Sequence, residues 1–423
     1  MIVSTAVKLA AGFVLLKYLA WEFGPTTFGL LSQVMGTAAI FYLCAGGGIT
    51  NGIIRNLAAV SSENERHRWM SAATTITVLS SIILAAVALA LALFGSNSIF
   101  GNARYAPIFV GIAGAQALVG FGNLALAYFS GTGHVRTFAI VQIVANLLSL
   151  LMLVALTESL GLAGAIIGLI VGPALVGVIS LGHFCRRKSN VDMLRIAWDR
   201  PLLRELLSYA AVMASSVAAV PVAQLLIRMD MSERLGWQMV GYWQAVAKIS
   251  DASMLFIGMI LINYLLPQLS RRNEAASALR FLARFGSLLL GLFVVGCGVI
   301  YLARDYLLLI IYSEQFLTAS SLLLPQLIGD TLKTATLLLY YYLMSRGRVL
   351  VVFFAELVLG VALYGLYLVL VPFYEAIAPI YAYVAAYAVV LVAMLVLLVV
   401  SGTSTTSSPS ATFASRRPPY ERL

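Results

Sequence analysis

The sequence predicts an all-α polytopic membrane protein with about twelve transmembrane helices in two six-helix lobes. Three observations lead to this fold class. Hydrophobic residues make up 61% of the 423-residue chain and charged residues only 10%, a composition typical of a protein inside a bilayer. Apolar stretches of about 20 residues, long enough to cross the hydrocarbon layer, follow one another between short polar breaks. The two halves of the chain also resemble each other.

Twelve apolar stretches are the expected spans, and the breaks between them leave no room for a separate catalytic module. We expect the second, eighth and tenth spans to tilt or kink because they are long, with bends at 46–48 and at Pro267. The expected spans are residues 2–22, 27–58, 70–94, 105–130, 134–157, 162–184, 203–229, 237–268, 279–303, 317–345, 348–372 and 376–400.

A weak repeat relates the two halves of the chain in one ungapped register. Because each half would carry six spans, both halves enter the membrane in the same direction. This parallel repeat is typical of transporters with a cleft between two bundles. The residues that correspond are Gly29 and Gly241, Asn51 and Asn263, Arg68 and Arg280, Tyr128 and Tyr340, and Arg136 and Arg348.

The repeat also predicts the domain boundaries. We expect an N-lobe over 1–184, a cytoplasmic linker over 185–204 and a C-lobe over 205–400. The linker contains an amphipathic stretch at 193–198 that is expected to lie on the inner leaflet. The segment 401–423 is rich in Ser, Thr and Pro and is expected to be a disordered cytoplasmic tail.

The net charge of +10 reflects orientation in the membrane rather than affinity for nucleic acid. If the N-terminus is cytoplasmic, most Arg and Lys residues fall in segments that follow even-numbered spans. Cytoplasmic segments of membrane proteins carry such an excess, so both termini are predicted to be cytoplasmic. The basic residues left on the opposite side are Arg104, Arg228, Arg234 and Arg304.

Charged residues inside the apolar spans are the strongest functional candidates. One charge at the bilayer centre costs about 2.5–3.5 kcal/mol on insertion scales, and such residues usually line a polar cavity or an ion path. Two polar stripes have the spacing i, i+4, i+7, which places each stripe on one helix face. An alternative is that they form two structural ion pairs within the C-lobe. The stripes are Gln244, Lys248 and Asp251 in the eighth span and Gln326, Asp330 and Lys333 in the tenth.

Three further cations are candidates for the same cavity. Lys17 and Arg228 lie near the outer ends of their spans, where snorkelling to the interface is an alternative role. Arg55, between Asn51 and Asn56, can equally be an anchor at the cytoplasmic end. Embedded bases outnumber embedded acids, and this excess favours an anionic ligand such as a diphosphate.

The embedded carboxylates are candidates for coupling to a proton or sodium gradient. They are Asp251, Asp330 and Glu356, and a desolvated carboxylate can take up a proton near neutral pH. A neighbouring lysine opposes protonation of the first two, so Glu356 is the better proton candidate. Its alternative role is a hydrogen-bonded carboxyl in helix packing.

The sequence predicts neither an enzymatic active site, a cofactor nor a metal site. The histidines at 67, 134 and 183 have no ligand spacing, and the chain contains no Walker loop for a nucleotide. A membrane-bound glycan polymerase or ligase, the enzymatic alternative, would need a sizeable outer loop. A purely structural scaffold would not need four embedded charges.

Five phrases of the sequence resemble Wzx-type flippases of lipid-linked oligosaccharides. The resemblance runs from about residue 5 to 395 and implies the fold of the multidrug/oligosaccharidyl-lipid/polysaccharide exporter superfamily, two lobes in a V around a central cavity. In this family, Lys248, Asp251, Asp330 and Lys333 match the embedded charges. The phrases are 23–30, 45–52, 241–251, 264–271 and 326–333.

The resemblance also implies a function. The expected substrate is an undecaprenyl-diphosphate oligosaccharide, such as the repeat unit of O-antigen or of the enterobacterial common antigen. Alternating access would carry it from the cytoplasmic to the periplasmic leaflet of a bacterial inner membrane. Membrane lipids and other glycan-assembly proteins, such as a polymerase and a chain-length regulator, are the expected partners. The alternative is an ion-coupled drug antiporter of the same superfamily, but cationic drugs favour an acidic cavity.

Overall fold

The computed structural model describes residues 2–60, 62–272 and 274–403, and every regular element within them is a helix. The elements of the first half are α1 (Ile2–Cys44), α2 (Thr50–Ala59), α3 (Glu63–Phe94), α4 (Ser96–Phe100), η1 (Ala103–Tyr105), α5 (Ala106–Gly131), α6 (Val135–Leu160), α7 (Leu162–Phe184) and α8 (Lys188–Asp192).

The second half continues with the same kind of elements. They are α9 (Arg200–Leu235), α10 (Trp237–Ile260), η2 (Leu261–Leu265), α11 (Leu266–Ser270), α12 (Ala275–Leu302), α13 (Arg304–Ile311), η3 (Glu314–Ala319), α14 (Ser320–Ser345), α15 (Val349–Tyr374), η4 (Glu375–Ile377) and α16 (Ala378–Thr403).

The helices confirm the all-α multi-pass membrane fold. Within the described residues, nine helical stretches are long and apolar enough to cross a membrane. Two of them contain two helices each: Val7–Cys44 divides at Gly24, and Val349–Leu398 contains α15 and α16. Together with α9, which is long but carries more charged residues, they account for the twelve expected spans.

The two predicted bends are confirmed. Between α1 and α2, Gly46, Gly47 and Gly48 all have positive φ, between 68° and 79°, a conformation that glycine adopts at little cost. The second bend precedes Pro267, where α10 passes through the π-helical turn η2 into α11. Proline lacks an N–H and its ring displaces the carbonyl four residues earlier, so the regular ladder is interrupted there.

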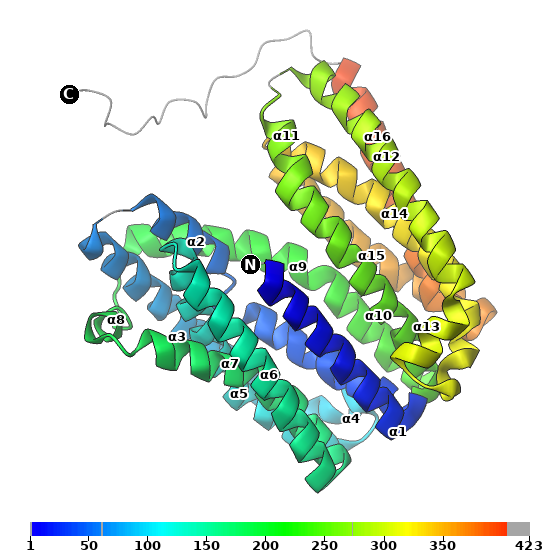
Figure 1. Ribbon diagram of the computed structural model, residues 1–423, viewed down its shortest axis with the longest axis horizontal. Helices are drawn as coiled ribbons and strands as arrows, with labels where there is room; N and C mark the ends of the chain where they lie inside the picture. Colours follow the sequence, from blue (N-terminus) through cyan, green and yellow to red (C-terminus); the bar gives the residue numbers. More distant parts are fainter. Residues whose placement is uncertain (1, 61, 273, 404–423) are drawn as a thin grey trace.

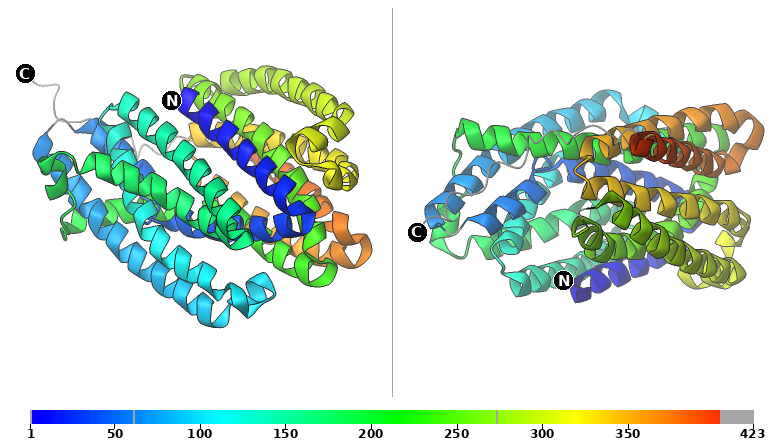
Figure 2. Two further views of the ribbon diagram at one scale, coloured as in Figure 1. Left: turned by 60° about the horizontal axis from the view of Figure 1, so that its bottom comes forward. Right: turned by 90° about the horizontal axis from the view of Figure 1, so that it is seen from above.

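The helices form two lobes arranged as a V (Figure 1). The N-lobe contains α1 to α7 and the C-lobe α10 to α16 (Figure 2). Helix α9 begins against the N-lobe, with Leu203 and Leu206 in its core, and crosses to the C-lobe, where it packs on α15. In the N-lobe, α7 packs on α5 and α6, and α3 packs on α5. In the C-lobe, α16 packs on α14 and α15, and α12 packs on α14. Corresponding helices therefore have corresponding partners, which confirms the parallel repeat.

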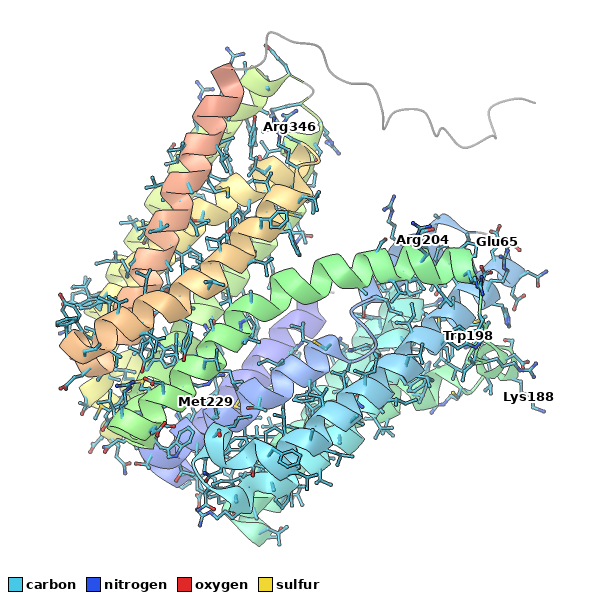
Figure 3. All side chains as sticks on the ribbon, turned by 180° about the vertical axis from the view of Figure 1, so that it is seen from behind. Glu65, Lys188, Trp198, Arg204, Met229 and Arg346 are labelled. Atoms are coloured by element: carbon cyan, nitrogen blue, oxygen red, sulfur yellow. The ribbon has the colours of Figure 1, made fainter. Side chains whose placement is uncertain are left out.

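Basic residues mark the end of the molecule at which the lobes diverge. Figure 3 shows Lys188 and Arg204 at that end of the N-lobe side and Arg346 at the same end of the C-lobe. We call this the basic end. Because α1 begins there and reverses direction after Gly24, the junction of the lobes lies at the opposite end.

The linker between the lobes is attached to the N-lobe. Met193 is buried in the N-lobe core, and the Thr75 hydroxyl exchanges two hydrogen bonds of 3.0 Å with the backbone of Ala197. Trp198, by contrast, is 70% exposed. Only part of the stretch predicted to lie on the inner leaflet is therefore available to lipid.

A glycine-mediated helix crossing joins the lobes at the end opposite the basic end. Gly29 of α1 lies against the backbone of Trp237, and Gly241 of α10 lies against the backbone of Pro25. A β-carbon on either glycine would overlap the facing carbonyl oxygen. Gly29 and Gly241 correspond in the repeat, as do Pro25 and Trp237, so the crossing is a reciprocal contact of the kind that a two-fold axis produces.

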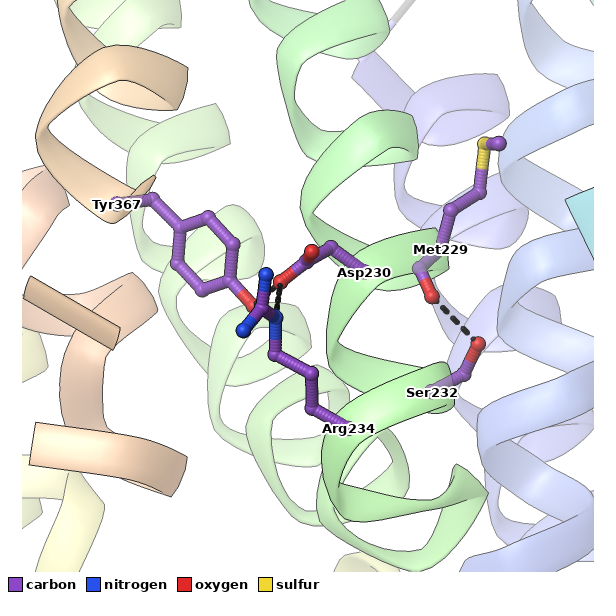
Figure 4. A network of polar contacts seen from close by, with 5 residues as sticks. All are labelled: Met229, Asp230, Ser232, Arg234 and Tyr367. Carbon is purple, nitrogen blue, oxygen red and sulfur yellow. Dashed lines mark hydrogen bonds and ion pairs between the residues drawn. The ribbon is translucent and has the colours of Figure 1, made fainter. Parts of the chain in front are cut away.

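A polar network at the same end fixes α9 to α15. The Asp230 carboxylate accepts a hydrogen bond of 2.7 Å from the Tyr367 hydroxyl and another of 2.7 Å from Nε of Arg234 (Figure 4). The Ser232 hydroxyl donates to the carbonyl of Met229 in the same helix (Figure 4). The outer end of α9 is thus held within the C-lobe.

The crossing predicts an unequal response to three glycine-to-alanine substitutions. Gly29→Ala and Gly241→Ala should each lower the free energy of unfolding by about 1–3 kcal/mol, because the added methyl group overpacks a backbone contact. Gly258→Ala in the same α10 helix is the matched control, since a β-carbon there meets no atom within 4 Å. Thermal unfolding in detergent would compare them; equal unfolding temperatures for all three would contradict the crossing.

Candidate functional site

The two charged stripes lie in the C-lobe on neighbouring helices, α10 and α14. Asp330 of α14 is fully buried. Its Oδ1 accepts hydrogen bonds from the Ser250 hydroxyl at 2.6 Å, the Tyr383 hydroxyl at 2.9 Å and Nε2 of Gln326 at 3.3 Å. Among the described residues, its Oδ2 has no hydrogen-bond partner. Donors from three helices therefore hold one oxygen of this carboxylate, and no donor of the described residues contacts the other oxygen.

Lys333 lies one turn after Asp330, yet the part of the chain that the structure describes contains no ion pair between them. The Lys333 ammonium instead lies 5.9 Å from the ring centroids of both Tyr383 and Tyr387 of α16. A cation at this distance from aromatic faces is attracted by their quadrupoles. Lys333 thus has aromatic neighbours and acts electrostatically on Asp330 and Glu356 without an ion pair to either in the described residues.

Lys248 and Asp251 form the ion pair of the other stripe. Lys248 Nζ lies 3.3 Å from Asp251 Oδ2, and the side chains are 29% and 55% exposed. Both residues belong to α10, so the pair does not join two helices, and exposed pairs of this kind contribute about 0–1 kcal/mol. Of the two structural ion pairs expected under the alternative, the described residues contain only Lys248–Asp251, and that pair lies within one helix.

A small cavity of about 30 Å³ lies between α9, α10, α14 and α16. Asp251 and Lys333 both line it, together with Gln224, Gln326 and Tyr383. A polar cavity of this volume has room for water or a small ion.

Arg228 is buried at the junction of the lobes, with 4% of its surface exposed. Its Nε donates to Oε1 of Gln33 at 2.7 Å, and Nε2 of Gln33 donates to the carbonyl of Ile99 at 3.2 Å. The guanidinium also packs against Gly36. Arg228 does not snorkel to the interface; it links α9 to α1 and, through Gln33, to α4.

The remaining candidates lie apart from the small cavity. Lys17 is exposed on α1 and Arg55 is exposed on α2, both in the N-lobe. Glu356 is half-buried on α15, where Lys333 acts on it electrostatically. The structure therefore brings together Lys248, Asp251, Asp330 and Lys333, with Glu356 nearby.

Neither Ser250 nor Tyr383 is singled out by the sequence as a partner of Asp330. Ser250 lies next to Asp251 in the sequence, but successive residues point to different sides of a helix, so adjacency gives no signal for this contact. Tyr383 belongs to α16, and spacing within one helix carries no information about a partner on another. In the described residues, no group of three or more His, Cys, Asp or Glu side chains is arranged to hold a metal ion.

Comparison with known proteins gives matches along the whole chain. A family model described as polysaccharide biosynthesis protein matches residues 1–272. The lipid III flippase of Escherichia coli (strain K12) is 29% identical over 393 residues, covering 91% of this chain and 93% of the relative. The lipid III flippase of Shigella flexneri matches with the same identity and coverage.

Solved structures with the same fold include two kinds of transporter. An inward-facing multidrug resistance MATE family transporter of the MOP superfamily superposes with a TM-score of 0.72 at 15% identity, covering 95% of this chain and 96% of the other. The lipid II flippase MurJ in an inward closed conformation gives 0.74 at 12% identity, covering 94% and 86%. At these identities the likeness establishes the fold.

The hydrogen bonds of Asp330 predict a stability difference between two aspartate substitutions. Asp330→Ala should lower the free energy of unfolding by about 1–3 kcal/mol, because it leaves buried hydroxyls of Ser250 and Tyr383 without an acceptor. Asp251→Ala should change it by less than about 1 kcal/mol, because its pair is partly exposed. Thermal unfolding in detergent measures both; a larger loss for Asp251→Ala would disprove the assignment of the buried acceptor.

Proposed function

The chain belongs to the polysaccharide biosynthesis protein family, and from that premise we propose that it is a flippase for an undecaprenyl-diphosphate-linked oligosaccharide. The observation that carries the proposal is the likeness to lipid III flippases over nine-tenths of the chain. We propose transport from the cytoplasmic to the periplasmic leaflet of a bacterial inner membrane. The protein then moves its substrate without catalysing a chemical reaction.

The embedded cations support an anionic head group. Lys248 and Lys333 are both half-buried within the C-lobe, and the Lys333 ammonium has no carboxylate partner among the described residues. A diphosphate is a suitable ligand because ammonium groups bind phosphate oxygens as point charges. We propose that these lysines meet the diphosphate, and that Lys17 and Arg55 add to a basic surface along its path. Arg228 contributes by linking α9 to α1 at the junction of the lobes.

The arrangement of the lobes supports alternating access. The lobes meet at the Gly29–Gly241 crossing and diverge toward the basic end. Basic segments of membrane proteins stay in the cytoplasm, so we propose that the basic end and both termini are cytoplasmic and that this conformation faces inward. Separation of the lobes along the side of the V gives the lipid tail a place in the bilayer while the head group crosses.

We propose that Asp330 couples transport to a proton or sodium gradient, with Asp251 and Glu356 as further candidates. Asp330 has an oxygen without a donor, and Asp251 lines a cavity with room for water or a small ion. Occupation of Asp330 by a cation would weaken its attraction for Lys333 and so favour binding of the diphosphate by that lysine. No cofactor is required.

The remaining proposals follow from the sequence. The domain boundaries are an N-lobe over 1–184, a linker over 185–204, a C-lobe over 205–400 and a tail over 401–423, of which 404–423 lie outside the described residues. A polymerase and a chain-length regulator of glycan assembly are proposed partners.

The alternative function is an ion-coupled drug antiporter, because MATE transporters share the fold and fold alone does not decide function.

Translocation in vesicles tests the flippase proposal. Purified protein would be reconstituted, and the movement of a neryl-diphosphate-linked sugar across the bilayer would be measured. Lys248→Ala and Lys333→Ala should each lower the rate at least about tenfold, the effect of losing one charge-assisted contact. Lys188→Ala is the matched control, because Lys188 is exposed at the basic end. Failure of correctly folded wild-type protein to move any such lipid under an imposed gradient would favour the antiporter.

The same vesicles test the coupling proposal. Asp330→Asn keeps an oxygen that can accept from Ser250 and Tyr383 but has no negative charge to hold a cation. Wild-type transport should accelerate when a proton or sodium gradient is imposed, whereas transport by Asp330→Asn should be the same with and without the gradient. If transport by Asp330→Asn responds to the gradient as wild-type transport does, the coupling residue is Asp251 or Glu356 instead.

A further inference from the structure

A second cavity lies in the N-lobe, outside the charged cluster. Its volume is about 430 Å³, within the range of about 300–1,000 Å³ typical of small-molecule sites. Helices α1, α5, α6 and α7 line it, and it is partly open to the outside. We call it the N-lobe pocket. It is more than ten times larger than the cavity of about 30 Å³ in the C-lobe.

One wall of the N-lobe pocket is a third polar stripe. Gln142, Asn146 and Ser149 of α6 line it and have the same i, i+4, i+7 spacing as the two charged stripes. Asn123 of α5 lines it as well. All four side chains are half-buried and uncharged. The lobes therefore differ in chemistry: this stripe of the N-lobe is uncharged, whereas the two stripes of the C-lobe contain carboxylates and lysines.

The side-chain amides of this wall have donors and acceptors that are not engaged in hydrogen bonds. Within the described residues, the side chains of Gln142 and Asn123 form no hydrogen bond. Nδ2 of Asn146 donates to the carbonyl of Gln142 at 2.6 Å, which leaves its Oδ1 as an acceptor. The Ser149 hydroxyl, by contrast, lies 2.7 Å from the carbonyl of Ala145 in its own helix and 2.8 Å from the carbonyl of Gly172 in α7, and can donate to either. Half-buried amides within a membrane need water or a polar ligand as hydrogen-bond partners, so their gathering at one wall points to a polar ligand.

The other lining residues restrict what that ligand can be. Lys8, near the start of α1, is the one charged residue among the side chains that line the pocket in the described chain. Much of the remaining lining is apolar, including Leu15, Met35 and Leu153, and the Tyr42 ring is fixed by a hydrogen bond of 2.7 Å to the carbonyl of Ile170. Amides together with apolar surface suit a sugar ring, and a single ammonium at the basic-end side suits an attached phosphate.

We propose that the N-lobe pocket binds the sugar adjacent to the diphosphate of the lipid-linked oligosaccharide. Gln142, Asn146 and Asn123 exchange hydrogen bonds with its hydroxyl or acetamido groups, and Lys8 faces the phosphate. This assignment rests on the proposed flippase function. The N-lobe then recognises the sugar, and Lys8 adds to the charges of the C-lobe that serve the diphosphate and the coupling ion.

Binding of matched ligands to the purified protein tests the assignment. The probes are neryl diphosphate and a set of neryl diphosphates that each carry one hexose or N-acetylhexosamine. For the preferred sugar, wild-type protein should bind the sugar-bearing lipid about tenfold more tightly than bare neryl diphosphate, the effect of one or two additional hydrogen bonds. In Gln142→Leu/Asn146→Leu protein this ratio should fall to about one, with the affinity for neryl diphosphate retained.

A steric block provides an independent variant with a matched control. Gly12 lines the pocket, and a β-carbon there meets no atom within 4 Å, so Gly12→Phe should fill the pocket without moving the backbone. Gly114 of α5 has equally open surroundings but does not line the pocket. Gly12→Phe should abolish the preference for the sugar, and Gly114→Phe should preserve it. Lys8→Gln should weaken both ligands together.

The outcomes separate this assignment from the flippase proposal. If wild-type protein binds neither bare nor sugar-bearing neryl diphosphate, the flippase proposal fails. If wild-type protein prefers a sugar and the variants keep that preference at unchanged unfolding temperatures, the sugar is bound elsewhere and the assignment is overturned. An equal loss of both ligands in the leucine variant would also overturn it, because the pocket would then not distinguish the sugar.

Discussion

The close approach of two backbones at Gly29 and Gly241 is the constraint on which the arrangement of the lobes depends. Each glycine faces a carbonyl oxygen of the other half, and a β-carbon at either position would separate the helices. The contact is reciprocal because the two glycines are equivalent in the repeat. The crossing fixes where the lobes meet and leaves their basic ends apart.

Each charged group in the C-lobe is stabilised by a different kind of contact. Asp330 accepts three hydrogen bonds at one oxygen, Lys333 lies near two tyrosine rings, and Lys248 pairs with Asp251. None of these contacts neutralises both members of the Asp330–Lys333 stripe. An embedded cluster that is satisfied in part can respond to an ion or an anion, whereas a fully paired cluster would be a structural element only.

The lobes share a fold but differ in the chemistry of their interiors. The stripe of α6 has amides and a serine at the spacing at which α10 and α14 have charges. A head group made of a sugar and a diphosphate likewise combines an uncharged polar part with a charged part. Helix α9 and Arg228 add a polar link between the lobes near the glycine crossing.

The sequence by itself determined the fold class, the number of spans, the two bends and the repeat, because hydropathy, glycine, proline and register are properties of the local chain. It also selected Lys248, Asp251, Asp330 and Lys333, since a charge in an apolar span is conspicuous without a structure. Only the tertiary structure decided that Asp330 bonds to Ser250 and Tyr383 rather than to Lys333, that Arg228 is buried against Gln33, and that uncharged amides surround a cavity. These contacts join helices far apart in the chain, and periodicity within one helix specifies a face but not the partner that the face meets.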